Sequence, residues 1–262
     1  TPDGGAYWPD QLTFYSDAIG GAEWSPDGKT ILFRKDHDGD EHEQLYLLPE
    51  NGGQVDTLTN NPKAIFAGQF APDGRSIIYT SNERNEPYFY CYRLDLTSRK
   101  RTLLFQSDNQ NGLIGISPNN RWLFVERDSG NANGYVYVVD LDAPLARRIP
   151  RLLTPHSDDA SFSGFTISPD SRTLYFFTDE DREFTTRAEL RFQDRDARII
   201  FRDSVPHDVD QDIFSRDGKV EVITRNVDGV SQLTIYDVVT GQTLRGPQLP
   251  ESGFITNLQV SG

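Results

Sequence analysis

A short turn phrase with the pattern Ser-Pro-Asp-Gly returns along most of this 262-residue chain. The first residues of successive phrases lie 46, 46, 51 and 47 residues apart. The five occurrences begin at Ser25, Ala71, Ser117, Ser168 and Ser215, and the last has decayed to Ser-Arg-Asp-Gly. A phrase that recurs at such regular spacing is typical of a protein built from structural repeats.

Each period divides into four strand-sized segments joined by turns, which predicts one blade of a β-propeller. In the first full period we expect strands at 20–24, 30–35, 44–48 and 54–59. The fourth strands of the later periods are expected at 101–105, 147–153, 197–201 and 243–249. The predicted blades span 15–60, 61–106, 107–154, 155–202 and 203–250. The fold class is therefore all-β, as a single propeller domain over 1–262 with little helix.

Both ends of the chain resemble pieces of a blade. Residues 1–14 match the last hairpin of the first period, and 251–262 match the first strand of another period. An open ring would expose long strand edges, which natural proteins avoid. We therefore expect these partial blades to belong to a longer parent with about seven blades, in the range usual for propellers.

Charge excludes some partners. The chain has 26 Lys and Arg against 40 Asp and Glu, a net charge of −14, which disfavours nucleic acid and anionic membranes as partners. No apolar run is long enough to insert into a membrane.

Cys91 is the only cysteine and lies in a strand-like run, so we expect a buried residue. The compartment stays open between cytoplasm and periplasm.

No residue pattern indicates catalysis, a cofactor or a metal. Ser117 and Ser231 come closest to a Gly-x-Ser-x-Gly nucleophile turn, but both lack the second glycine. The segment 36–41 concentrates carboxylates that could surround calcium, yet it departs from the helix-flanked calcium loop, and a solvated hairpin is the favoured interpretation. The histidines lack the spacing of a zinc site.

The turns between the second and third strands of each blade are expected to share one face, and they are rich in Asp and Glu. This face is predicted to attract or filter cationic peptide segments, with ordinary loop solvation as the alternative. The residues of this predicted acidic rim are Asp36, Asp38, Asp40, Glu41, Glu83, Glu86, Asp179, Glu180, Asp181 and Glu183.

Several longer strings resemble the amino-terminal propeller of the prolyl oligopeptidase family, especially its acylaminoacyl-peptidase-like and dipeptidyl-peptidase-like bacterial members. They are the segments 38–47, 153–156, 178–184 and 227–233. The Ser-Pro-Asp-Gly phrase alone is less specific, because TolB-type propellers share it.

The resemblance implies a function that this chain carries only in part. In that family an α/β-hydrolase domain with a Ser-Asp-His triad follows the propeller, and the propeller admits peptide substrates while excluding large folded chains. No triad residue can be assigned here, and the glutamate pair that holds substrate amines in dipeptidyl-peptidase-like members is not recognisable. We expect a catalytically silent propeller partnered by a hydrolase domain of the same parent. The alternative is a stand-alone TolB-like protein-binding module.

Overall fold

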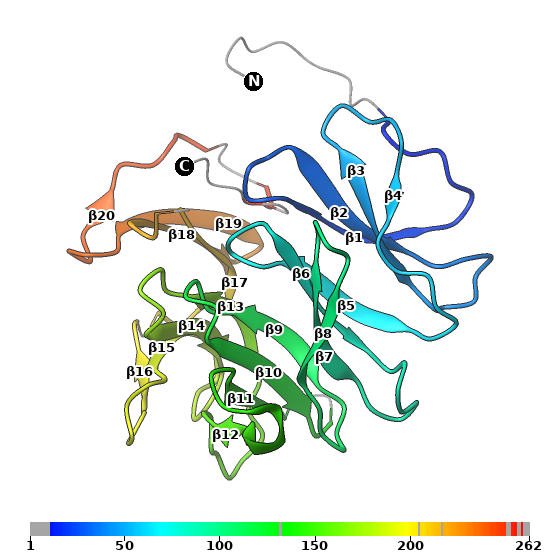
Figure 1. The fold of residues 1–262 in the computed structure, drawn as a ribbon. Helices are drawn as coiled ribbons and strands as arrows, with labels where there is room; N and C mark the ends of the chain where they lie inside the picture. The colour runs from blue at the N-terminus through cyan, green and yellow to red at the C-terminus, as the bar shows by residue number, and fades with distance from the viewer. Residues whose placement is uncertain are drawn as a thin grey trace. The chain divides into compact units, whose positions relative to one another are not determined.

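The computed structural model describes residues 11–130, 133–203, 205–215, 217–249, 253–255 and 258. The chain forms two compact units, Thr1–Asn111 and Gly112–Gly262. Five four-stranded antiparallel sheets lie in these units, so all five predicted blades are present (Figure 1). The described ranges contain no α-helix.

Unit 1 holds blades 1 and 2. Blade 1 consists of β1 (Ile19–Trp24), β2 (Thr30–Lys35), β3 (Gln44–Pro49) and β4 (Asp56–Thr57). Blade 2 consists of β5 (Ile65–Phe70), β6 (Ser76–Ser81), β7 (Tyr90–Asp95) and β8 (Arg101–Phe105). In both sheets the strands pair in sequence order. Their facing sides bury one apolar cluster, which includes Leu32 and Leu45 of blade 1 and Ile77 and Tyr79 of blade 2.

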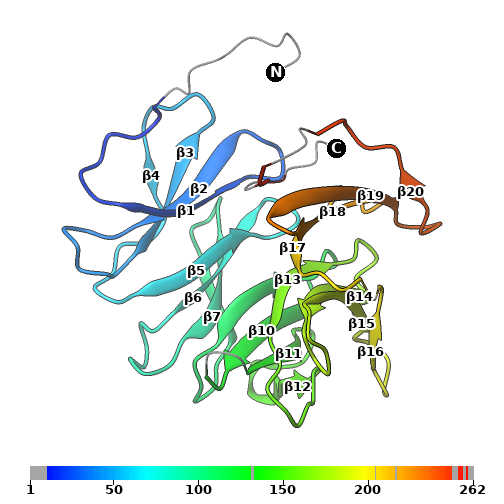
Figure 2. The same ribbon diagram turned by 180° about the vertical axis from the view of Figure 1, so that it is seen from behind.

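Unit 2 holds blades 3 to 5. Blade 3 consists of β9 (Gly112–Ile116), β10 (Trp122–Asp128), β11 (Gly134–Asp140) and β12 (Arg151–Leu152). Blade 4 consists of β13 (Phe162–Ile167), β14 (Thr173–Thr178), β15 (Thr186–Arg191) and β16 (Ile199–Phe201). Blade 5 consists of β17 (Val209–Phe214), β18 (Val220–Val227), β19 (Val230–Asp237) and β20 (Thr243–Leu244). The first strand of blade 4, β13, lies beside β9 and β17, as the radial repetition of blades requires (Figures 1 and 2).

The outer strands differ most from their predicted bounds. The fourth strand spans only 56–57 in blade 1, 151–152 in blade 3 and 243–244 in blade 5, where 54–59, 147–153 and 243–249 were expected. The segment Leu145–Arg147 forms a short 3₁₀ helix in place of the start of that strand. An outer strand is hydrogen-bonded to a neighbouring strand on one side only. The residue preferences of the sequence therefore do not define where it begins and ends. The predicted partial blades fall mainly outside the described residues, which form no strand at 11–14, 253–255 or 258.

Every first strand contains a β-bulge or a similar irregularity in its pairing with the second strand. In β1 the register shifts between Gly20 and Ala22, and the intervening Gly21 has a φ of 62°. The strands β5, β9, β13 and β17 carry the same irregularity. Bulges increase the local twist of a strand and leave one residue unpaired. The bulge in β5 contains Phe66, whose side chain is exposed.

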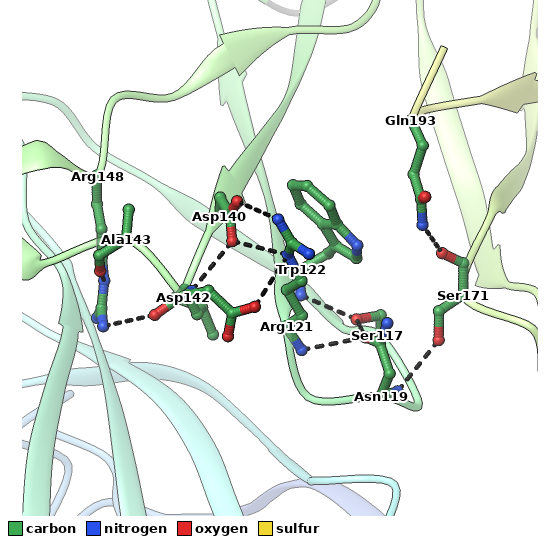
Figure 3. A network of polar contacts seen from close by, with 11 residues as sticks. Ser117, Asn119, Arg121, Trp122, Asp140, Asp142, Ala143, Arg148, Ser171 and Gln193 are labelled. Carbon is green, nitrogen blue, oxygen red and sulfur yellow. Dashed lines mark hydrogen bonds and ion pairs between the residues drawn. The ribbon is translucent and has the colours of Figure 1, made fainter.

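The recurrent phrase forms the turn between the first and second strands. In blade 3 the Ser117 hydroxyl donates to Asn119 Oδ1 at 2.6 Å and accepts from the Trp122 amide at 2.9 Å (Figure 3). The same two bonds recur at Ser25, Ser168 and Ser215. The serine at the head of the phrase is therefore a structural residue that closes the turn.

Blade 2 has Ala71 at this position, which supplies a matched pair of substitutions. Ser117→Ala leaves the part-buried Trp122 amide without its acceptor and is expected to lower the free energy of unfolding by about 0.5–1.5 kcal/mol. Ala71→Ser adds the missing acceptor and is expected to raise it by about 1 kcal/mol. Urea denaturation of both variants measures these changes. If both substitutions change the free energy of unfolding in the same direction, the hydroxyl does not have the role described here.

Candidate functional site

The predicted acidic rim residues lie in three strand-connecting turns. Asp36, Asp38, Asp40 and Glu41 lie between β2 and β3, and Glu83 and Glu86 lie between β6 and β7; both turns are in unit 1. Asp179, Glu180, Asp181 and Glu183 lie between β14 and β15 in unit 2. Each turn joins the second strand of a blade to its third, as the sequence predicted.

In unit 1 several of these carboxylates already have partners. Asp40 Oδ1 accepts the amides of His37 and His42, so it stabilises its own turn. Glu83 forms an ion pair with Arg101 at 2.6 Å, and Glu86 forms one with Lys63. These contacts leave a smaller uncompensated charge on unit 1 than the sequence indicates.

The ligand atoms of Asp17, His37 and Asp38 lie within 4.8 Å of one another, and the last two residues are exposed. The Lys35 ammonium group donates to Asp17 Oδ2 at 3.1 Å. The Lys35 ammonium group therefore already neutralises part of the negative charge of these residues, and we assign no metal to them.

Unit 2 has an acidic hollow beside the β14–β15 turn. It has a volume of about 420 Å³ and is lined by Asp158 and Asp159 from the connection between blades 3 and 4 and by Glu180 and Asp181 from the turn. The turn is held in place by a hydrogen bond of 2.7 Å from the Ser161 amide to Asp179 Oδ1. The sequence prediction included the two turn residues but missed the two aspartates.

A second hollow of about 650 Å³ lies at the adjoining end of blade 3, where Glu126 and Asp128 of β10 line it together with Phe162. Burial raises the pKa of the Glu126 carboxyl, and neighbouring Asp128 raises it further. Gly112 lies opposite, where an added Cβ would approach the Glu126 side chain to 2.6 Å. The glycine therefore leaves the room that this side chain occupies.

His156 lines the first hollow, Asn133 lines the second, and their side chains are in contact. The His156 ring stacks on Tyr135 with 4.5 Å between ring centroids, and its Nε2 lies 2.6 Å from Asn133 Oδ1. Its Nδ1 lies 2.8 Å from the Thr154 carbonyl oxygen, so the ring is fixed in orientation. Burial raises the pKa of the Glu180 carboxyl, while nearby His156 lowers it in part.

We call the two hollows together the acidic groove. Its carboxylates are Glu126, Asp128, Asp158, Asp159, Glu180 and Asp181. Among the described residues that line it, none is lysine or arginine. A concave surface bordered by carboxylates raises the local concentration of cations, so the acidic groove suits a positively charged group.

The serines considered as nucleophiles have structural contacts. The Ser117 hydroxyl closes its turn, and the Ser231 hydroxyl accepts the Ile255 amide at 3.0 Å. Cys91 is buried on β7. No described helix is long and apolar enough to cross a membrane.

Comparison with known proteins identifies the family. The model of the TolB beta propeller domain matches residues 10–166, which is more than half of the chain. The chain belongs to the TolB-type propeller family. No curated protein sequence matches this TolB-type propeller.

Solved structures share the fold at low identity. TolB from Acinetobacter baumannii is 19% identical with a TM-score of 0.56, over 85% of this chain and 52% of that one. A prolyl endopeptidase is 18% identical with a TM-score of 0.67, over 90% and 36%. Prolyl oligopeptidase B from Galerina marginata, bound to a 35mer substrate, is 12% identical with a TM-score of 0.67, over 88% and 34%. This TolB-type propeller thus spans about half or less of each of these proteins.

Proposed function

We propose that this TolB-type propeller is the non-catalytic part of a serine peptidase of the prolyl oligopeptidase family, of the acylaminoacyl-peptidase-like or dipeptidyl-peptidase-like kind. In this role it controls which peptides reach an α/β-hydrolase domain of the parent chain. The acidic groove of unit 2 is the observation that carries the proposal. It binds the cationic segments of extended peptides and holds them at the propeller surface.

The acidic groove suits an extended chain because its two neighbouring hollows are bordered by carboxylates from three separate segments. These segments are the end of β10, the connection 155–160 and the β14–β15 turn. A flexible cationic side chain reaches such carboxylates more readily than a rigid folded surface does.

A stand-alone TolB-like binding module is the second candidate. A putative TolB from Agrobacterium tumefaciens favours it, since the match has a TM-score of 0.63 at 18% identity and covers 80% of that protein. The genomic sequence that follows the codon for Gly262 separates the candidates. The peptidase proposal expects further blade sequence and then Gly-x-Ser-x-Gly. A stop codon directly after the propeller would favour the binding module.

Peptide binding tests the groove. A fluorescent arginine-containing peptide is expected to bind this chain, and Glu180→Gln with Asp181→Asn is expected to weaken binding about tenfold, since each exposed ion pair contributes up to about 1 kcal/mol. Asparagine suits position 181, where φ is 52°. Fluorescence anisotropy at low and high salt measures both effects, and added salt is expected to weaken binding.

The control removes the same charge elsewhere on blade 4. Asp194 and Asp196 are exposed residues between β15 and β16, at the opposite end of the strands from the groove. Asp194→Asn with Asp196→Asn is expected to leave peptide affinity within about twofold. Equal losses in the two double variants would show that only net charge matters and would contradict a site at the groove.

A further inference from the structure

A cluster of buried charges lies between blades 4 and 5. Arg187 of β15 is 4% exposed, and its guanidinium Nε donates to Glu221 Oε1 of β18 at 2.9 Å. The same guanidinium lies 3.6 Å from Asp203, which also pairs with Arg225 of β18. Glu221 is 1% exposed and Arg225 is 6% exposed, so the cluster is withdrawn from solvent.

Asp212 of β17 adds a third carboxyl group to this cluster. In the β17–β18 ladder Asp212 pairs with Ile223, and Glu221 pairs with Phe214 two residues along. The two acidic side chains therefore share one face of the sheet as diagonal neighbours. Asp212 Oδ1 is buried and accepts no hydrogen bond within the described residues.

The charges around this pair do not balance if every carboxyl group is ionised. Two guanidinium groups, of Arg187 and Arg225, face the three carboxylates of Asp203, Asp212 and Glu221. Arg202 also acts electrostatically on Asp212, and it forms its own ion pair with Glu189 at 3.1 Å. Two further titratable neighbours among the described residues are the phenols of Tyr175 on β14 and Tyr236 on β19. Within the described part of the chain, one negative charge would thus be buried without a counterion, and this is very costly.

We propose that Asp212 and Glu221 form a proton-binding site that couples the packing of blade 4 against blade 5 to pH. One proton from solvent binds a carboxylate oxygen of the pair, and the resulting hydroxyl donates to the other carboxylate. When that proton returns to solvent, the pair carries two negative charges beside Arg187. The excess charge weakens the contact between the two blades.

The titration of Asp212 supports this assignment. Burial raises the pKa of the Asp212 carboxyl to about 8, and the Glu221 charge adds to the shift while Arg187 opposes it. In the unfolded chain the group titrates near 3.8. The folded state therefore holds a proton that the unfolded state lacks between these two values. The contribution of this group to the free energy of unfolding is greatest below pH 3.8. It falls as the pH rises and levels off above about pH 8.

Denaturation as a function of pH tests the proposal with Asp212→Asn. Between pH 5 and pH 8 the ratio of the wild-type unfolding constant to that of the variant is expected to rise about tenfold for each pH unit, since one proton is released on unfolding. Asp210→Asn is the matched control, because Asp210 is an exposed carboxylate on the same strand. The control is expected to keep the wild-type slope. If the unfolding constant of Asp212→Asn rises with pH as steeply as that of the wild type, the proposal is wrong.

A second measurement needs no variant. Carbon-13 NMR of the wild-type carboxyl groups is expected to show one aspartate that titrates close to pH 8. Calorimetric unfolding in two buffers of different ionisation enthalpy is expected to release about one proton at neutral pH. If every carboxyl group titrates in its ordinary acidic range, no proton is shared and the proposal is wrong.

Discussion

Arg187→Met is expected to lower the free energy of unfolding by about 3–5 kcal/mol, because it leaves the fully buried Glu221 carboxylate without its partner. Methionine fills much of the space of the arginine stem but supplies no donor. The lost packing over the Tyr236 ring, whose centroid lies 4.9 Å from the guanidinium carbon, adds to the effect. Guanidinium chloride denaturation at neutral pH measures the loss.

Two further variants separate charge from packing. Arg191 is an exposed residue on the same strand, so Arg191→Met is expected to change stability by less than about 0.5 kcal/mol. Adding Glu221→Gln to Arg187→Met removes the unpaired charge and is expected to recover part of the loss. If the double variant is no more stable than Arg187→Met, the unpaired carboxylate is not the cause.

Phe192→Ala is expected to cost about 3–5 kcal/mol, since Phe192 is fully buried and joins the cores of blades 3 and 4. Its ring meets that of Phe124 edge-on at 4.8 Å between centroids, and the Trp122 ring at 5.9 Å. The fluorescence of Trp122 should therefore respond to the loss of the ring. Calorimetry and tryptophan emission during denaturation measure the two effects.

Ile200→Ala is a suitable control for Phe192→Ala, because Ile200 lies on the same blade with an exposed side chain. It is expected to change stability by less than about 0.5 kcal/mol. A loss of that small size for Phe192→Ala would contradict the view that blades 3 and 4 share one core.

The sequence predicted the blades well because each has local signals. The phrase at Ser25 recurs with a spacing that fixes the turn, and alternating apolar residues fix the second and third strands. The fourth strands were predicted too long at 147–153 and 243–249 because they pair on one side only. The 3₁₀ helix at Leu145–Arg147 follows Pro144 and overlaps the predicted start of the strand at 147–153.

The candidate site could be predicted only in part. Glu180 and Asp181 were visible because they lie in a turn that repeats with the blade. Asp158 and Asp159 lie in a connection between blades, and their approach to the turn depends on tertiary packing. The pairing of Arg187 with Glu221 was invisible for the same reason, since the partners are 34 residues apart on different blades.

The most direct test of the proposed function is to locate a bound cationic peptide on the isotopically labelled chain by amide chemical-shift mapping. Shifts are expected to concentrate at 126–130, 155–162 and 178–183, the segments that form the acidic groove. They should disappear in the variant with Glu180→Gln and Asp181→Asn. Shifts that concentrate at the Ser-Pro-Asp-Gly turns, or that persist unchanged in this variant, would contradict the proposed function.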